Sequence, residues 1–234
     1  EARPERPFYI GSVSKPVTAT LVMRLVEAGA IDLEAPASRY VDIELPDDIR
    51  VLDLLRHRSG IPQSAGYPGW SAQSVSLKEW VERVEFRPAP RSFEYSNLNY
   101  ALLGAVIEGA TGTGYAEVLK THLTDPLGMS QTAAPDSPRA VDGLVGGHQY
   151  YYGFPAAHPE DGYLSYEIPA GYVTASATDL GRLGGMYLNG GALDGSRVLT
   201  AGSVERLLTP PETGVPYARG RRTAAAADLR LRRH

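Results

Sequence analysis

Residues 8–16 read FYIGSVSKP and lead into a strongly apolar helix pattern. Apolar side chains recur at four-residue spacing from Val17, which predicts a largely buried helix over about 12–28. Ser12 and Lys15 are three residues apart at its start, so their side chains share one helix face. An amine beside a hydroxyl can take up the hydroxyl proton, and removal from water favours the neutral amine that this needs. The stretch therefore predicts a nucleophilic serine at the positive end of a helix.

A second segment adds weight, because Ser-x-x-Lys alone is expected about once by chance in a chain of this length. Residues 93–97 read FEYSN and open another apolar helix, expected over about 96–109. Tyr95 supplies a phenol whose ionised form a lysine cation favours, and Asn97 supplies an amide that can hold Lys15 or a substrate carbonyl. A lone Tyr-x-Asn is more often a cap with a packed aromatic ring. The succession of two motifs, both at helix starts, favours a catalytic interpretation.

Together the motifs resemble those of the serine β-lactamase and penicillin-binding-protein superfamily. They are most similar to the branch of class C β-lactamases, D-alanyl-D-alanine carboxypeptidases and related esterases, in which Tyr-x-Asn is the second motif. Similar segments are LLRHRSGIP at 54–62, PLGM at 126–129 and PAGYV at 169–173. The resemblance implies an α+β (α/β) fold of the β-lactamase/transpeptidase type, with a helical lobe and an antiparallel sheet. It implies one domain over 1–234, with a helical subdomain at roughly 30–175.

The resemblance also implies a mechanism. Ser12 would attack a carbonyl and form an acyl-enzyme, which water then releases. Lys15 and Tyr95 would share the work of the general base, and which of them holds the proton stays open. Asn97 would orient Lys15 and the substrate amide, and the Ser12 backbone N–H would supply half of an oxyanion hole. The substrate is an amide or ester: a D-Ala-D-Ala peptide, a β-lactam or a small ester. No cofactor is implied.

The sequence departs from the family at its third motif, Lys-Thr-Gly or His-x-Gly on a strand, which is not found. His234 follows a strand-like run and would be the first residue of a truncated His-x-Gly, so it is a candidate substrate-binding residue. The outer strands of the sheet are expected to be truncated at both ends. If 1–234 were the whole polypeptide, we would expect impaired activity and low stability. The alternative is a non-catalytic binding or scaffold protein of the same fold, or an inactive fragment.

Composition excludes several other classes. A net charge of −4 argues against general nucleic-acid binding, and no apolar run reaches membrane-spanning length, although a longer parent could carry membrane helices. The chain has no cysteine, and its five histidines lack metal-ligand spacing, so no metal is expected. His57 is interpreted as a structural loop residue. A small molecule or peptide is the expected partner, in an extracytoplasmic location, with a cytoplasmic one and the oligomeric state left open.

The remaining patterns predict short elements. Expected helices cover about 48–56, 76–84 (opened by a capping box), 115–123, 175–188 and 201–208. Expected strands cover 41–45, part of 146–154 and 197–199, and the tail over 224–233 reads as either helix or strand.

Overall fold

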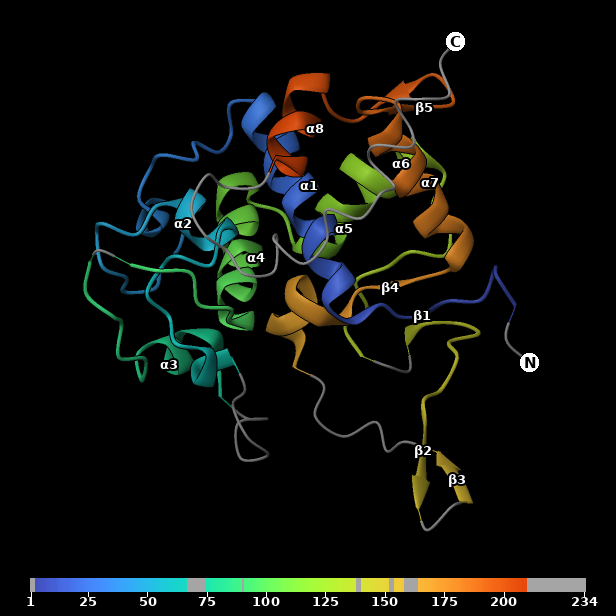
Figure 1. Ribbon diagram of the computed structural model, residues 1–234, viewed down its shortest axis with the longest axis horizontal. Helices are drawn as coiled ribbons and strands as arrows, with labels where there is room; N and C mark the ends of the chain where they lie inside the picture. Colours follow the sequence, from blue (N-terminus) through green and yellow to red (C-terminus); the bar gives the residue numbers. More distant parts are fainter. Residues whose placement is uncertain are drawn as a thin grey trace.

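The structure is a computed structural model that describes residues 3–66, 75–89, 91–137, 140–151, 154–157 and 164–209. Two long helices form its centre, α1 (Ser14–Glu27) and α4 (Asn97–Thr111), and they pack against each other (Figure 1). Their apolar faces supply much of the core, including the fully buried side chains Leu21, Leu98, Leu102, Leu103 and Ile107. Both helices carry one of the predicted motifs at the N-terminal end, so the packing of the core brings the two motifs together.

Shorter helices surround this pair. They are α2 (Val51–Leu55), α3 (Leu77–Val81), α5 (Tyr115–Leu119), α6 (Asp125–Leu127), α7 (Ala177–Leu188) and α8 (Ala201–Leu208). Single helical turns are η1 (Gly11–Val13), η2 (Ala37–Arg39), η3 (Gln63–Gly66), η5 (Lys120–Thr124), η7 (Ser165–Glu167) and η8 (Ile168–Tyr172). The helix at 201–208 matches its prediction, and the predicted capping box is formed by Ser76 and Glu79.

The described strands form three two-stranded antiparallel pairs. β1 (Phe8–Tyr9) pairs with β4 (Thr174–Ala175), β2 (His148–Tyr151) with β3 (Phe154–Ala157), and β5 (Ala192–Leu193) with β6 (Ser196–Arg197). The β2–β3 pair lies apart from the helices, whereas β1–β4 lies beside the start of α1 (Figure 1). The β1–β4 pair therefore ties the segment before Ser12 to a part of the chain more than 150 residues away.

Two predicted elements were wrong in detail. The strand expected at 41–45 does not form: its side chains alternate in exposure, but no other described segment pairs with it, and residues 36 and 37 pair instead with residues 50 and 49. The helix expected to end near 123 continues through η5 and α6. It ends at Gly128, whose φ of +61° is a conformation that glycine adopts readily.

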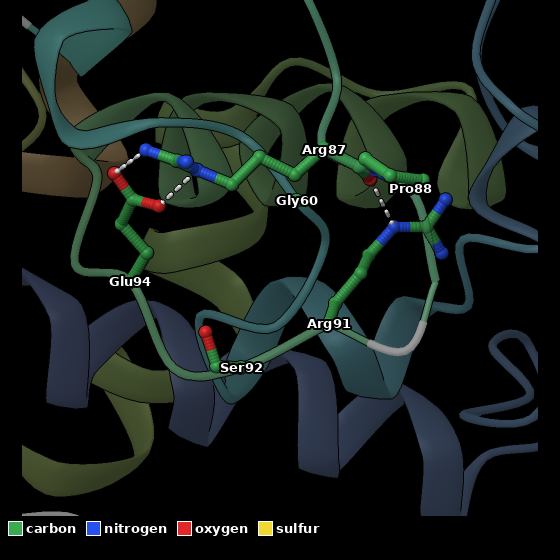
Figure 2. Close-up of a pocket in the computed structure, with 6 residues that line it drawn as sticks. All are labelled: Gly60, Arg87, Pro88, Arg91, Ser92 and Glu94. Atoms are coloured by element: carbon green, nitrogen blue, oxygen red, sulfur yellow. Dashed lines mark hydrogen bonds and ion pairs between the residues drawn. The ribbon is translucent and has the colours of Figure 1, made fainter.

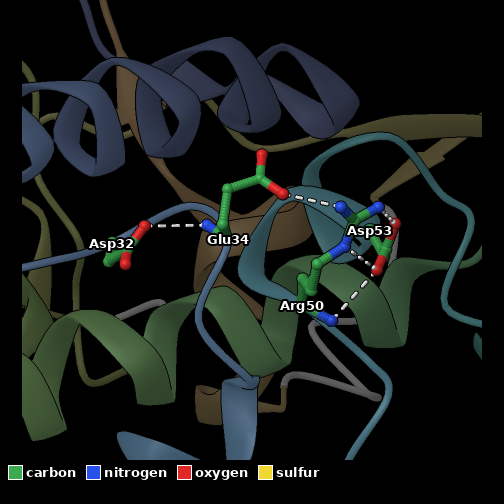
Figure 3. Close-up of polar contacts among 4 residues, drawn as sticks. All are labelled: Asp32, Glu34, Arg50 and Asp53. Atoms are coloured by element: carbon green, nitrogen blue, oxygen red, sulfur yellow. Dashed lines mark hydrogen bonds and ion pairs between the residues drawn. The ribbon is translucent and has the colours of Figure 1, made fainter.

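An ion-pair cluster fixes the connector between α1 and α2 (Figure 3). Arg50 precedes α2 and contacts Glu34 at 2.6 Å and Asp53 at 3.0 Å, while the Asp53 carboxylate also accepts the Arg50 backbone N–H. The Glu34 N–H donates to Asp32. The paired contacts between the Arg50 guanidinium and the Asp53 carboxylate explain how α2 begins without a serine or threonine cap.

Candidate active site

Ser12 lies in η1, the tight turn that opens into α1. Gly11 adopts a φ of +52°, which turns the chain out of β1. The turn is anchored because the Ile10 N–H donates to the Val173 carbonyl at 3.1 Å and the Val13 N–H donates back to Ile10. The Ser12 side chain is exposed. Among the described residues, no acceptor is paired with the Ser12 backbone N–H, which is therefore available to a ligand.

Lys15 is one helical turn further along the same face, and only 6% of it is exposed. Its ammonium nitrogen Nζ donates to three acceptors: Ser12 Oγ at 3.2 Å, Asn97 Oδ1 at 2.9 Å and the Ala170 carbonyl at 2.7 Å. Three is the full number of donors on an ammonium group, so the buried charge is completely hydrogen-bonded.

Tyr95 and Asn97 approach from the start of α4. The Tyr95 hydroxyl and Ser12 Oγ are 2.8 Å apart, and Lys15 Nζ lies 4.9 Å from the centre of the Tyr95 ring. Ser12 Oγ thus contacts a lysine and a phenol at once, at distances suitable for proton transfer. Four of the five predicted site residues come together here.

The fifth predicted residue, His234, lies outside the described residues. No group of three or more potential metal ligands occurs in the part of the chain that the structure describes. Within that same part, no helix has the length and apolarity to cross a membrane.

A strip of backbone at 169–173 completes the site, and sequence reasoning did not assign it a role there. Besides Ala170, the Pro169 carbonyl accepts a hydrogen bond from Thr18 Oγ1 at 2.7 Å, and the Val173 N–H donates to Ser14 Oγ at 3.2 Å. Three side chains of the first turns of α1 therefore bind this strip. The PAGYV motif was the available signal, but a backbone carbonyl that acts as a ligand has no residue type of its own.

His57 lies behind Tyr95 and is 8% exposed. The two rings are tilted by 30° with centroids 4.7 Å apart, and His57 Nδ1 is 3.3 Å from the Ser96 N–H, which donates to it. Burial, with the Lys15 charge as a second cause, lowers the pKa of His57 from 6.5 to about 4. The imidazole is therefore neutral at physiological pH.

Two arginine–carboxylate pairs lie next to the segment that carries Tyr95, and Figure 2 shows the one between Arg87 and Glu94. Glu94 contacts Arg87 at 2.6 Å, and the Gln63 N–H donates to the same carboxylate. Arg91 donates to the Arg87 carbonyl and binds Asp48 through two hydrogen bonds of 2.8 Å. A cavity of about 240 Å³ lies between these residues. Both arginines that line it already neutralise carboxylates, so this cavity is a structural feature beside the site.

Glu167 is the buried carboxyl group nearest in sequence to the 169–173 strip, with 8% exposure. Burial raises its pKa from 4.5 to about 7, and attraction to Lys15 opposes this rise. Its carboxyl group therefore carries only part of a negative charge near neutral pH.

Comparison with known proteins places this geometry in a family. The family model described as Beta-lactamase matches residues 1–234. Penicillin-binding protein 4 from Amycolatopsis lactamdurans is 31% identical over 209 residues, which are 84% of this chain and 55% of that protein. Teichoic acid D-alanine hydrolase from Staphylococcus aureus is 30% identical over 186 residues, 77% of this chain and 45% of that protein.

A solved structure gives the same result for the fold. D-amino acid amidase from Ochrobactrum anthropi SV3 superposes with a TM-score of 0.72 at 26% identity, over 87% of this chain and 59% of that one. The chain thus spans about half the length of these relatives. Since the family model covers every residue and the structural match agrees with it, the predicted fold is confirmed and the chain belongs to the β-lactamase family.

Proposed function

We propose that this chain carries the nucleophilic half of a serine hydrolase active site, which acts on an amide or ester through an acyl-enzyme on Ser12. One observation carries the proposal: Ser12 Oγ is hydrogen-bonded both to Lys15 Nζ and to the Tyr95 hydroxyl. A serine hydroxyl is a weak nucleophile until a neighbouring group takes its proton, and two such groups are in place.

The hydrogen bonds support a division of labour between Lys15 and Tyr95. Asn97 Oδ1 and the Ala170 carbonyl only accept, so they hold two N–H groups of Lys15. The third N–H is donated to Ser12, and when Tyr95 is ionised the Ser12 hydroxyl is the donor in the 2.8 Å hydrogen bond to the Tyr95 oxygen. In this arrangement Tyr95, in the phenolate form that the Lys15 cation favours, takes the proton as general base. Lys15 remains a cation that stabilises the negative charge developing on the two oxygens.

Formation of the acyl-enzyme then follows from the position of Ser12. Its oxygen attacks the substrate carbonyl, the bond to the leaving group breaks, and Tyr95 passes the proton to that group. The Ser12 N–H is placed to bind the oxyanion. Asn97 holds Lys15 in register and presents the rest of its amide to the substrate. Water attacks the ester of Ser12 by the reverse path and restores the hydroxyl.

The substrate class is proposed from the relatives. A D-alanine hydrolase and a D-amino acid amidase, by their names, act on D-amino acid derivatives. D-alanyl esters and amides are therefore the first compounds to try, ahead of β-lactams and simple esters. The same relatives, together with a penicillin-binding protein, support an extracytoplasmic location.

The test is covalent labelling, because it reports the nucleophile whatever the natural substrate. The full chain is incubated separately with a fluorophosphonate and a fluorescent penicillin, and adducts are mapped by intact and peptide mass. One adduct on Ser12 is expected. Ser12→Ala should abolish it and cost no more than about 1–3 kcal/mol of stability, because the side chain is exposed but Lys15 loses one of its three acceptors. Ser130→Ala, at another exposed serine, is the matched control and should label fully.

Two results would contradict the proposal. Equal labelling of Ser12→Ala and wild type would show that another residue reacts. Absence of any adduct on protein shown to be folded would favour a non-catalytic member of the fold.

A further inference from the structure

We propose that His57 is a positioning residue for Tyr95: it holds the phenol against Ser12 without contacting substrate. The proposal rests on the proposed function and adds to it a residue that lies outside the Ser-x-x-Lys and Tyr-x-Asn motifs. His57 belongs to the loop after α2, and Tyr95 precedes α4, so the contact joins two separate parts of the chain.

His57 binds the chain on both sides of Tyr95. The His57 carbonyl accepts the Glu94 N–H at 2.9 Å, and His57 Nδ1 accepts the Ser96 N–H at 3.3 Å. The backbone before and after the phenol is therefore attached to a single residue. With its two neighbours fixed, Tyr95 can reach Ser12 in only a narrow range of positions.

The conformation of His57 allows this double contact. Its φ of +53° is left-handed, a region that few non-glycine residues occupy. The turn aims the carbonyl and the ring at the same segment. Such an outlier persists only where surrounding contacts over-determine it, and the contacts of His57 with the Tyr95 segment are among those that do so here.

The ring must be neutral with its proton on Nε2. Nδ1 faces two donors, the Ser96 N–H and the Asn99 side-chain amide at 3.2 Å. The orientation of Asn99 is fixed because Ser59 Oγ donates to its Oδ1 at 2.5 Å, which turns Nδ2 toward His57. Burial and the Lys15 charge oppose protonation, consistent with this arrangement.

The ring itself fills the space behind Tyr95. Besides the 4.7 Å contact with Tyr95, its centroid lies 5.2 Å from that of Tyr100 and 5.8 Å from that of Phe93. Removal of the imidazole would therefore leave both an unpaired Ser96 N–H and a gap beside the phenol. A displacement of about 1 Å at a reacting group can cost about 100-fold in rate.

Two substitutions distinguish the contributions of the left-handed backbone, the hydrogen-bond acceptor and the imidazole ring of His57. His57→Gly tolerates the left-handed conformation but removes the acceptor and the ring. His57→Asn also tolerates it, and its Oδ1 takes the place of Nδ1 as acceptor. The rate of Ser12 labelling by a fluorophosphonate, per folded molecule, should fall about 10- to 100-fold in His57→Gly. It should recover most of its value in His57→Asn.

A double-mutant cycle then distinguishes positioning of Tyr95 from general support of the fold. In a Tyr95→Phe background, His57→Gly should leave the residual labelling rate unchanged, because the group through which His57 acts is already gone. An equal loss in both backgrounds would overturn the proposal. Equal labelling of His57→Gly and wild type would also overturn it, while leaving the proposed function intact. If wild type itself is not labelled, the proposed function and this inference fail together.

The protonation state of the His57 ring can be tested on the wild-type chain, so this test does not depend on whether a variant folds. Nitrogen-15 NMR of the His57 ring should show an unprotonated Nδ1 and a protonated Nε2 at pH 7. A proton on Nδ1 would rule out acceptance of the Ser96 N–H and would overturn the proposal.

Discussion

Gly104→Ala should displace the backbone at 169–170, which supplies an acceptor to Lys15. Gly104 lies within α4 opposite Pro169, and a Cβ at this position would lie 2.4 Å from Pro169 Cγ, where ordinary contact begins at 3.4 Å. The two must therefore separate by about 1.0 Å (3.4 − 2.4). A proline ring is tied to its own backbone, so the backbone at 169–170 must move. That backbone supplies the carbonyls that accept Thr18 and Lys15 at 2.7 Å each.

Overpacking of this kind costs about 1–3 kcal/mol of stability. Because Lys15 loses its shortest hydrogen bond or shifts with it, we also expect the rate of Ser12 labelling to fall about 10- to 100-fold per folded molecule. Thermal unfolding gives the first quantity and fluorophosphonate kinetics the second. Ile107→Val is the control: it lies in the same helix, fully buried, and costs about 0.5–1.5 kcal/mol without adding an atom. A Gly104→Ala protein that is destabilised but labels as fast as the control would refute the link between this strip and Lys15.

Further predictions concern buried polar groups. Ser14→Ala should cost about 1–3 kcal/mol, because it leaves the Val173 N–H without its acceptor. Ser96→Ala should cost nothing, because no described group is hydrogen-bonded to the buried Ser96 Oγ. Chemical unfolding of both variants would show the contrast, and equal losses would contradict it. Glu167→Gln should stabilise the folded protein by up to about 3 kcal/mol at pH 8 but not at pH 4. The pKa of Glu167 is raised in the folded state, so wild type loses folding stability as pH rises from 4.5 to about 7, and glutamine does not titrate. Wild type should lose about 3 kcal/mol of folding stability as pH falls from 6.5 to about 4, because the unfolded His57 binds a proton that the folded one does not, and His57→Asn should remove this loss. Melting temperatures measured across pH test both predictions. Curves for Glu167→Gln and His57→Asn that run parallel to that of wild type would refute these assignments.

The sequence was informative where function depends on side chains at helix starts. The periodic apolar pattern placed both helices, and motif spacing selected Ser12, Lys15, Tyr95 and Asn97, which the fold brings together. The sequence was uninformative where backbone groups, and not side chains, hold the site residues in place. The Ala170 carbonyl accepts a hydrogen bond from Lys15, which is 155 residues away in sequence. The PAGYV motif at 169–173 does not indicate that one of its backbone carbonyls binds a side chain of the site. The wrong strand at 41–45 has a related cause, because alternation indicates an extended segment but does not supply a partner strand.

Two buried groups for which no contact with Ser12 is found, His57 and Glu167, also influence the electrostatics of the site. Near neutral pH, His57 is uncharged because its pKa has fallen to about 4, and Glu167 is only partly charged because its pKa has risen to about 7. A second cation at His57 would repel Lys15, and a fully charged Glu167 would attract the Lys15 ammonium more strongly. Burial suppresses both. In the proposed mechanism, Lys15 is thus the dominant charge near Ser12 and Tyr95, and its three acceptors fix where that charge acts.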